Sequence, residues 1–332
     1  MKGTSILVTG GTGFIGSHLV RRLYAAGARV AVITKYNSIF ENVRLAGIWD
    51  KLTVIEADIR NLDSCLPLRR KKFDVIFHLA AYNHVGDSFT HVGESFDVNA
   101  RGTANLLDSC RGFQRFVYIS SSEVYGLQPG IPFRETASPL PISPYSIGKY
   151  GGELYCRMRR HAHGLPIAVV RPFNAFGPYQ SAKAVIPELI IRCLKGKPIR
   201  TTEGLQTREF NYVENLVDGI IAAGAEPRAV GEVVNLGSGR DIAIRDLVKR
   251  IHSLSGSSSA LEIGALPHRP TEIWKMAAAN RKAASILNWK PKVSFEEGLK
   301  ITIEWYREYL EVFENPASKL IRLGDYSRFG SV

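Results

Sequence analysis

Residues 6–16, Ile-Leu-Val-Thr-Gly-Gly-Thr-Gly-Phe-Ile-Gly, decide the fold of this chain. A short apolar run typical of a strand leads through glycines into a segment with apolar residues at helical spacing. In such a strand, turn and helix, the glycines allow a sharp turn, close approach of the backbone to a phosphate, and tight packing of the helix on the sheet. We therefore predict that this turn binds a dinucleotide, with contacts from Gly10, Thr12, Gly13, Phe14, Ile15 and Gly16.

The pattern of strand and helix continues along the chain. Further strand-like apolar runs lie at 30–33, 52–55, 75–79, 116–120 and 167–170, with helical stretches between most of them. Strands that are apolar along their whole length belong to a parallel sheet covered on both faces. We predict an α/β fold, a Rossmann-type doubly wound parallel sheet with a smaller C-terminal substrate-binding lobe. The expected division places 1–172 and parts of 205–240 in the dinucleotide-binding domain, mainly 173–315 in the lobe, and 316–332 in a tail.

Composition narrows the classes of function. With 332 residues, 45% apolar and 22% charged, the chain is globular, and no apolar run is long enough for a transmembrane helix. The net charge of +12 favours an anionic partner, but the basic clusters at 69–72 and 157–160 lack interleaved aromatic residues, so we expect no nucleic acid and no membrane partner. No C-x-x-C pair joins the four widely spaced cysteines, so we expect no metal site, no disulfides and a cytoplasmic location.

The end of the second predicted strand bears on the choice of cofactor. An acidic residue there would accept hydrogen bonds from an NAD ribose, and this chain has Thr34-Lys35 instead. Lys35 can pair with a 2′-phosphate, so the sequence favours NADP and leaves NAD possible; the alternative is that Lys35 is a surface lysine. Asp58 and Ile59, after the third strand, are placed to meet the adenine.

A serine, a tyrosine and a lysine form the candidate catalytic set. Ser121 follows a buried-type strand, Tyr145 comes 24 residues later, and Lys149 lies one helical turn beyond Tyr145. A nearby ammonium and a cationic nicotinamide both favour the phenolate, so we expect Lys149 to lower the pKa of Tyr145. Tyr145 is then a general base for an alcohol hydroxyl, which Ser121 holds. Taken alone, a tyrosine and a lysine four residues apart are more often a helix-surface pair.

With these motifs in place, the chain resembles the extended short-chain dehydrogenases/reductases of the NAD-dependent epimerase/dehydratase family, whose members act on nucleotide sugars. The resemblance runs from Gly10 to about Trp305. Beyond the glycine turn and the Tyr145/Lys149 pair it rests on segments 78–81 (His-Leu-Ala-Ala), 99–103 (Asn-Ala-Arg-Gly-Thr), 171–178 (Arg-Pro-Phe-Asn-Ala-Phe-Gly-Pro), 208–213 (Arg-Glu-Phe-Asn-Tyr-Val), 235–239 (Asn-Leu-Gly-Ser-Gly) and 269–272 (Arg-Pro-Thr-Glu).

Glu123 separates the subgroups by resemblance. Nucleotide-sugar 4,6-dehydratases carry a glutamate two positions after the catalytic hydroxyl, and similar C4-epimerases lack it. The implied reaction oxidises C4 of the hexose, removes the C5 proton with Glu123, eliminates water across C5–C6 and returns the hydride to C6. Ser122 stands where dTDP-glucose dehydratases have an aspartate acid, which leaves the acid for water loss open; GDP-mannose dehydratases, to which this chain is more similar, carry a serine there. A UDP-glucuronate decarboxylase, an epimerase and a non-catalytic cofactor-binding scaffold are the alternatives.

The resemblance also implies residues around the two ligands. A nucleotide-diphosphate sugar would meet His84, Ser121, Asn174, Arg208 and Arg269, and the cofactor would meet Leu79, Ala80, Ala81, Tyr145 and Lys149. Asn99 is expected to fix the backbone near the cofactor rather than to do chemistry. A homodimer or homotetramer is expected, with the helix from Tyr145 through Arg160 as the candidate interface.

Overall fold

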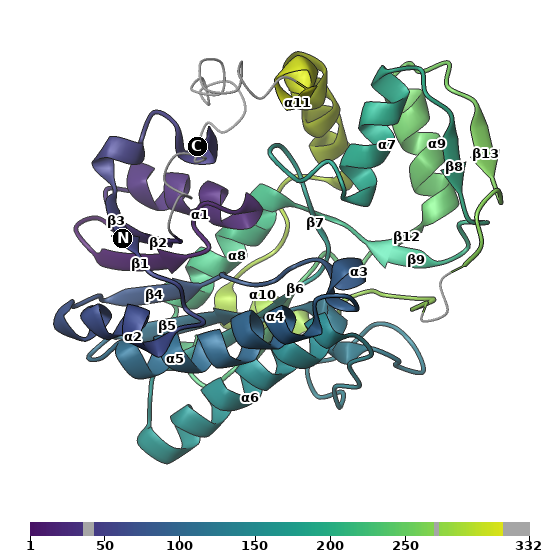
Figure 1. The fold of residues 1–332 in the computed structure, drawn as a ribbon. Helices are drawn as coiled ribbons and strands as arrows, with labels where there is room; N and C mark the ends of the chain where they lie inside the picture. The colour runs from purple at the N-terminus through teal and green to yellow at the C-terminus, as the bar shows by residue number, and fades with distance from the viewer. Residues whose placement is uncertain (36–42, 269–271, 315–332) are drawn as a thin grey trace.

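A computed structural model describes residues 1–35, 43–268 and 272–314 of the chain, with side chains to residue 310. The expected tail at 316–332 lies outside the described residues. At the centre is a seven-stranded sheet in the order β11-β6-β5-β4-β1-β2-β3 (Figure 1), in which every neighbouring pair is parallel. Its strands are β1 (Ser5–Thr9), β2 (Arg29–Thr34), β3 (Thr53–Glu56), β4 (Val75–His78), β5 (Arg115–Ile119), β6 (Ile167–Pro172) and β11 (Val233–Leu236).

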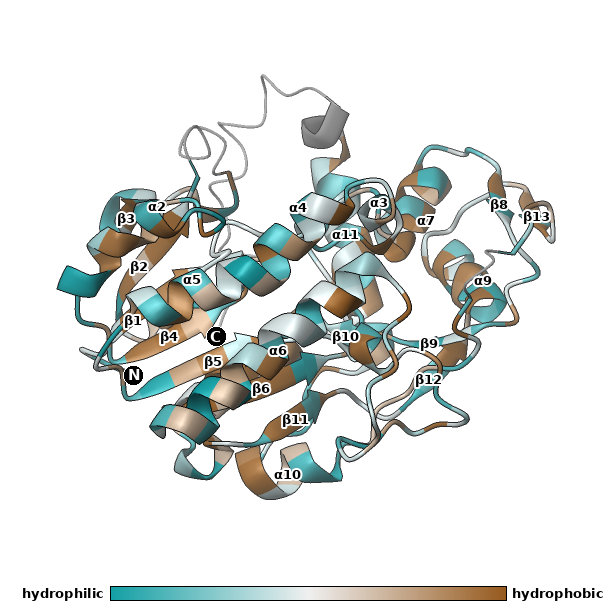
Figure 2. Cartoon of the chain, turned by 60° about the horizontal axis from the view of Figure 1, so that its bottom comes forward, coloured by the Kyte–Doolittle hydropathy of each residue, from teal (hydrophilic) through white to brown (hydrophobic). Residues whose placement is uncertain are grey.

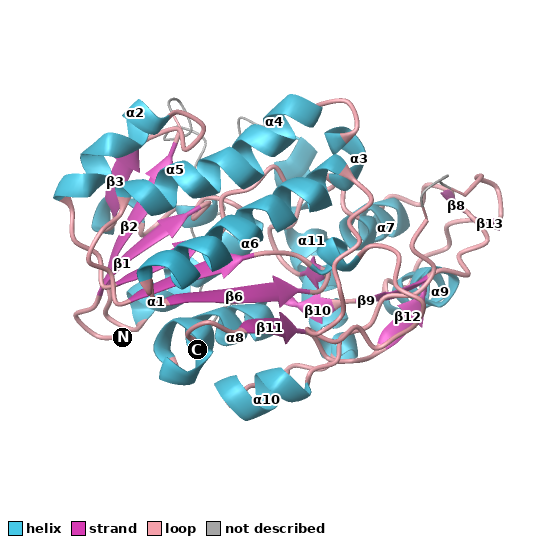
Figure 3. Cartoon of the chain, turned by 90° about the horizontal axis from the view of Figure 1, so that it is seen from below, coloured by secondary structure: helices cyan, strands magenta, loops and turns pink. Residues whose placement is uncertain are grey.

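Both faces of the sheet are buried, as the apolar strands predict. Along β1, Ile6 and Val8 belong to one hydrophobic core and Leu7 belongs to the core on the opposite face. Helices α1 (Phe14–Ala25) and α8 (Val213–Ala225) pack on the first face. On the second face lie α2 (Leu62–Cys65), α5 (Gly102–Ser109) and α6 (Pro144–His163), with α4 (Val92–Phe96) beside α6 (Figure 3). Figure 2 shows the hydropathy of the strands beside α5 and α6, with much of β4, β5 and β6 in the brown of hydrophobic residues. The predicted fold class is therefore confirmed.

The smaller lobe is built around helices that follow residue 184. Helix α7 (Val185–Leu194) packs against α9 (Ile244–Leu254) and α11 (Phe295–Glu314), while α10 (Arg281–Leu287) returns to β11. Three two-stranded sheets accompany these helices. They pair β7 (Ala175–Phe176) with β10 (Asn211–Tyr212), β9 (Thr207–Glu209) with β12 (Asp241–Ala243), and β8 (Ile199–Thr201) with β13 (Leu261–Ile263).

The strand order fixes where a ligand can bind. The chain runs outward from β1 through β2 to β3 on one side and returns to β4 on the other, so the order reverses between β1 and β4. At such a switch point the loops after neighbouring strands diverge and leave a crevice beyond the carboxyl ends of the strands. Val85, at the start of the short helix α3 (Val85–Ser88) that follows β4, and Ala175 of β7 both line this crevice.

Candidate active site

A cavity of about 630 Å³ occupies the crevice at the carboxyl ends of the strands. It brings together residues from the first turn of the chain with others more than 150 positions later. The predicted site residues that line it are Gly10, Thr12, Gly13, Phe14, Ile15, Gly16, Thr34, Lys35, Asp58, Ile59, Leu79, Ala80, Ala81, Ser121, Ser122, Glu123, Tyr145, Lys149 and Asn174. The predicted dinucleotide turn and the predicted catalytic set therefore share one cavity.

The glycine turn has the geometry that an anion site needs. Gly10 has φ +68°, and a Cβ there would lie 2.7 Å from the backbone nitrogen of Ala80. A Cβ on Gly16 would overlap the carbonyl oxygen of Gly10, so only glycine lets α1 come this close to the turn. Gly13 caps α1 without a side-chain hydrogen bond, which leaves the first N–H groups of the helix directed at the cavity.

At the end of β2 the cavity carries cations. Thr34 and the exposed Lys35 line it, and neither of these two last described residues before the gap at 36–42 is acidic. Asp58, after β3, is held by Arg60 through contacts of 2.6–3.0 Å, and Arg60 also reaches Glu94 at 3.1 Å. The hydrogen bonds from Arg60, with a smaller contribution from the charge of Lys35, lower the pKa of Asp58. Sequence reasoning missed Arg60; its place two residues after Asp58 was the available signal.

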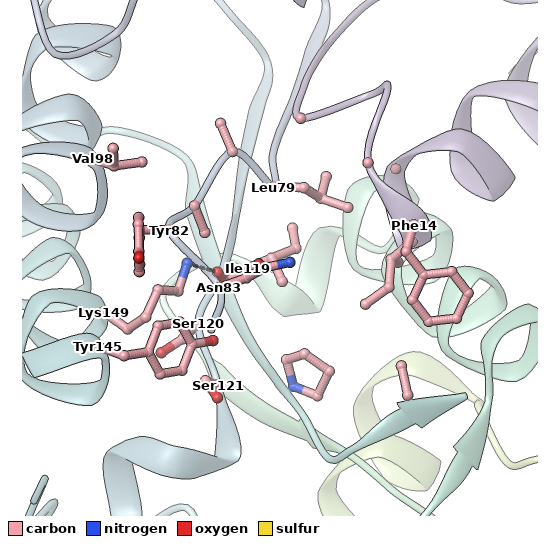
Figure 4. A pocket seen from close by; sticks show the side chains of 18 of the residues that line it. Phe14, Leu79, Tyr82, Asn83, Val98, Ile119, Ser120, Ser121, Tyr145 and Lys149 are labelled. Atoms are coloured by element: carbon pink, nitrogen blue, oxygen red, sulfur yellow. Dashed lines mark hydrogen bonds between the residues drawn. The ribbon is translucent and has the colours of Figure 1, made fainter. Parts of the chain in front are cut away.

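Tyr145 and Ser121 meet at the opposite end of the cavity (Figure 4). Helix α6 begins at Pro144, and the Ser143–Ser146 capping box fixes that start, so Tyr145 stands in the first turn beside the cavity. Burial raises the pKa of the Tyr145 phenol to about 12, with a smaller increase from the charge of Glu123, while its hydrogen bond with Ser121 acts in the lowering direction. Ser121 caps the 3₁₀ turn Ser122–Tyr125 and accepts the Glu123 N–H at 3.1 Å.

Lys149 shares the helix face of Tyr145 and is buried beside the end of β5. Its Nζ donates to the Ile119 carbonyl and lies 4.5 Å from the centre of the Tyr118 ring. Burial lowers the pKa of Lys149 to about 7, because a charged amine is poorly solvated at 2% exposure. Burial therefore disfavours the charged form of both Lys149 and Tyr145. That Lys149 lowers the pKa of Tyr145 stays a prediction.

Ser122 and Glu123 both line the cavity next to Ser121. The buried Ser122 hydroxyl donates to the sulfur of Met276 at 3.5 Å, and Asn174 contacts the same sulfur at 3.8 Å. Among the described residues, the carboxylates that line the cavity are Asp58, Glu94 and Glu123. Arg60 binds the first two, so Glu123 is the carboxylate at the Tyr145 end.

A buried ion pair between Glu153 and Arg171 contacts Ser120, the residue before Ser121. Ser120, which also lines the cavity, donates to Glu153 at 3.0 Å, and Glu153 pairs with Arg171 at 2.6 Å. Both charged side chains are at most 2% exposed. The pair therefore joins the end of β5, the middle of α6 and the end of β6. Sequence reasoning missed it because the three segments meet only in the folded chain.

Among the described residues, three predicted ones do not line the cavity: Asn99, His84 and Arg208. Asn99 is buried. Its Oδ1 accepts the backbone N–H of Tyr82 at 3.0 Å and its Nδ2 donates to the backbone carbonyl of Tyr82 at 3.1 Å, which agrees with the positioning role expected for it. His84 caps α3 by accepting the Asp87 N–H at 2.9 Å. Arg208 forms an ion pair with Glu272 at 2.5 Å. Arg269 lies outside the described residues.

The described residues contain neither a candidate membrane span nor a candidate metal site. No helix there is both long and apolar enough to span a bilayer. Across the same residues, no cluster of three or more His, Cys, Asp or Glu side chains is arranged to hold a metal ion. The four cysteines are all buried and unpaired.

Known proteins resemble the chain over almost its full length. The GDP-mannose 4,6 dehydratase family model matches residues 7–302. A UDP-glucose 4-epimerase of Mycolicibacterium smegmatis is 34% identical over 91% of this chain and 98% of its own length. A dTDP-D-glucose 4,6-dehydratase of Homo sapiens is 30% identical over 93% and 92%. The structure of a dTDP-glucose 4,6-dehydratase double mutant from Streptomyces venezuelae, with NAD bound, superposes with a TM-score of 0.85 at 30% identity over 93% and 98%.

Proposed function

Since the chain belongs to the extended short-chain dehydrogenase/reductase family of NAD-dependent nucleotide-sugar epimerases and dehydratases, we propose that it is a nucleotide-sugar 4,6-dehydratase. Its product would be a nucleotide-linked 4-keto-6-deoxyhexose. The observation that carries the proposal is Glu123, a carboxylate in the cavity wall close enough to Tyr145 to raise the pKa of that phenol. A reaction confined to C4 has no step for this carboxylate, whereas a dehydration needs a base at C5.

The cavity residues fit a nicotinamide dinucleotide, because the glycine turn and the N-terminus of α1 offer N–H groups to its pyrophosphate. When bound, that cofactor takes a hydride from C4 of the sugar and gives it back at C6. Tyr145 removes the proton of the C4 hydroxyl, which Ser121 holds by a hydrogen bond. Because burial is the main reason that the pKa of Tyr145 lies at about 12, the positive charge of a bound oxidised nicotinamide would favour the phenolate that acts as this base.

Glu123 acts after C4 has become a ketone. It removes the C5 proton, which the neighbouring ketone acidifies, and the electron pair of that C–H bond forms the C5=C6 double bond as the C6–O bond breaks. The departing hydroxyl needs a proton to leave as water. We assign this proton to Glu123, the carboxylate at this end of the cavity, with the Ser122 hydroxyl beside it as a relay once it leaves Met276. Hydride return to C6 and a solvent proton at C5 complete the product.

Incubation with sugar nucleotides tests the proposal. GDP-, dTDP-, UDP- and CDP-hexoses, each with NADP or NAD, are analysed by mass spectrometry for loss of one water. The proposal expects one of them to give a 4-keto-6-deoxy product. Inversion at C4 without mass change, or release of carbon dioxide from UDP-glucuronate, would contradict it.

Epimerisation at C4 is the second candidate, because the UDP-glucose 4-epimerase of Mycolicibacterium smegmatis matches this chain at 34% identity. It would use Tyr145 and Ser121 in the same way and would leave Glu123 without a chemical role. A Glu123→Gln variant separates the two: an epimerase keeps its rate, and a dehydratase stops after oxidation. Tyr145→Phe serves as the matched variant, since it removes turnover in either case.

We further propose that the cofactor is NADP rather than NAD. Lys35 and Arg60 place two cations at the adenosine end of the cavity, and Asp58 is already paired with Arg60. A 2′-phosphate would find cationic partners there, whereas the ribose of NAD would meet Thr34 and Lys35, rather than an acidic residue, among the residues described at the end of β2. Titration of both dinucleotides should give tighter binding of NADP, and Lys35→Glu should reverse the order. The exposed Lys249, far along the chain on α9, provides the charge-matched control Lys249→Glu.

We propose that the chain associates with a second copy of itself through an exposed apolar face of α6. On α6, Ile147, Leu154 and Met158 are 43–46% exposed and fall on one face at helical spacing. Val92 and Phe96 add exposed apolar surface on the adjacent α4. Light scattering should give a homodimer or a homotetramer, and Leu154→Asp should yield monomers. Leu205→Asp, at the similarly exposed Leu205 outside this face, should leave the assembly intact.

A cytoplasmic location completes the proposal. The four cysteines are buried as free thiols, which suits a reducing compartment. Fractionation of source cells should recover the protein with soluble cytoplasmic markers, and recovery with the membrane or an extracellular fraction would contradict this assignment.

A further inference from the structure

Two side chains from the N-terminal part of the chain, His18 and Arg44, contact the loop that precedes α7. The His18 ring, on α1, lies 3.1 Å from the carbonyl oxygen of Pro178 through its Nε2. The Arg44 guanidinium donates to the carbonyl of the next residue, Tyr179, at 3.1 Å. Both contacts join segments more than 130 residues apart. They fix two consecutive carbonyls at the point where the chain leaves the 171–178 segment and turns toward α7.

The same two side chains are tied to the glycine turn. Arg44 also donates to the Thr12 carbonyl at 3.5 Å, so one guanidinium spans the turn and the loop. His18 stands one helical turn after Phe14 and packs edge-on against its ring, with centroids 5.8 Å apart. Thr12 and Phe14 both line the cavity. The glycine turn is therefore connected to the Pro178 and Tyr179 carbonyls through the side chains of His18 and Arg44.

Both ring nitrogens of His18 have a partner. Its Nδ1 lies 2.5 Å from Glu214 Oε1, and its Nε2 lies 3.1 Å from the Pro178 carbonyl oxygen. Burial opposes ionisation of Glu214, but the hydrogen bonds and charges of His18 and Arg22 outweigh it and lower the pKa of Glu214. The ring is 1% exposed, so this contact is a fixed part of the interior.

Tyr179, whose carbonyl accepts from Arg44, has an uncommon backbone conformation. Tyr179 has φ +66°, a region that residues with a Cβ seldom adopt, and its ring is buried against Trp305 at 4.7 Å between centroids. The next residue, Gln180, lines the cavity, and so do Ala184 and Val185 at the start of α7. The carbonyl held by Arg44 thus immediately precedes the part of the loop that a substrate would meet.

We propose that His18 and Arg44 are positioning residues that couple the two halves of the cavity, so that a dinucleotide on the glycine turn and a nucleoside diphosphate sugar on the 180–185 loop strengthen each other's binding. The assignment of the two ligands to these halves rests on the proposed function. Neither residue touches the reacting atoms. Each acts by setting the distance between the turn and the loop, and the coupling is reciprocal by thermodynamic necessity.

The coupling is measured in binding experiments that need no turnover. The dissociation constant of NADP, or of NAD if that binds more tightly, is determined by calorimetry for the full-length protein alone and with saturating GDP, UDP, dTDP or CDP. We expect one nucleoside diphosphate to tighten dinucleotide binding at least fivefold in the unchanged protein. In Arg44→Gln and in His18→Gln this factor should fall below two, while the affinity for the dinucleotide alone stays within twofold.

Steady-state kinetics provide the second readout. The two variants should raise the KM for the sugar nucleotide several-fold and leave kcat nearly unchanged. Arg192→Gln, which removes an exposed arginine paired with Glu188, is the matched control and should behave as the unchanged protein. Two independent variants guard against a substitution that prevents folding.

Several results would overturn the coupling. The proposal fails if the unchanged protein shows no coupling, if the variants keep the full factor, or if they weaken dinucleotide binding alone with the factor intact, which is the pattern of a structural role. If coupling is found but no sugar nucleotide loses water, the dehydratase proposal falls alone. If none of the four nucleoside diphosphates binds, the substrate class and the coupling fall together.

Discussion

Removing the guanidinium from the buried Glu153–Arg171 pair should destabilise the protein strongly. In Arg171→Met the Glu153 carboxylate keeps its hydrogen bond from Ser120 but loses both contacts to Arg171, at 2.6 Å and 3.1 Å, in a place with no solvent exposure. Breaking a buried pair in this way costs about 3–5 kcal/mol, because one charge stays buried without a partner. For 332 residues the entropy of unfolding is roughly 0.7 kcal/mol/K, so we expect a fall in Tm of about 4–7 °C.

Urea unfolding followed by circular dichroism measures this loss, with two comparison variants. The double variant Glu153→Gln/Arg171→Met leaves no unpaired charge and should recover much of the lost stability. Arg192→Gln breaks an ion pair whose side chains are 40% and 50% exposed, which should change the free energy of unfolding by no more than about 1 kcal/mol. If Arg171→Met costs no more than Arg192→Gln, the pair does not anchor the catalytic turn and the reasoning is refuted.

Three further predictions concern the cavity itself. Gly16→Ala should abolish dinucleotide binding in a calorimetric titration, because the added Cβ would overlap the Gly10 carbonyl; retained affinity would show that the turn can yield. Tyr145→Phe should lose turnover and keep dinucleotide affinity, and an active variant would remove Tyr145 from the chemistry. Burial lowers the pKa of Lys149 to about 7 from its usual 10.5, so between these values the unfolded chain binds more protons and the folded protein gains stability as pH rises. Lys149→Met should therefore stabilise the protein more at pH 6 than at pH 9. A gain in the free energy of unfolding that is the same at both pH values would contradict a lowered pKa for the buried Lys149 amine.

The parts of the site that the sequence predicts are those whose chemistry is local along the chain. The glycine turn needs only a strand, three glycines and a helix in succession, and Gly10 and Gly16 show why no other residue fits. Tyr145 and Lys149 share a face because one helical turn separates them. The fold class follows from apolar strands alternating with helices, which can be buried only between two helix layers.

The remaining features depend on contacts that one sequence does not display. Arg171, Glu153 and Ser120 come from three elements, and Met276 reaches Ser122 from 154 positions away. The spacing of Tyr145 and Lys149 predicts that they are neighbours but not that both are desolvated, and burial is the largest influence on the pKa of each. Arg208 was expected at a pyrophosphate, and the fold pairs its guanidinium with Glu272.

The most direct test follows the fate of one hydrogen during turnover in D₂O. If Glu123 removes the C5 proton after oxidation at C4, the product of the active sugar nucleotide should lack one water and carry one deuterium, at C5, while the hydrogen at C6 comes from C4. Glu123→Gln should give neither change. A product of unchanged composition that differs only in the configuration at C4, or full dehydration by Glu123→Gln, would contradict the role assigned to this carboxylate.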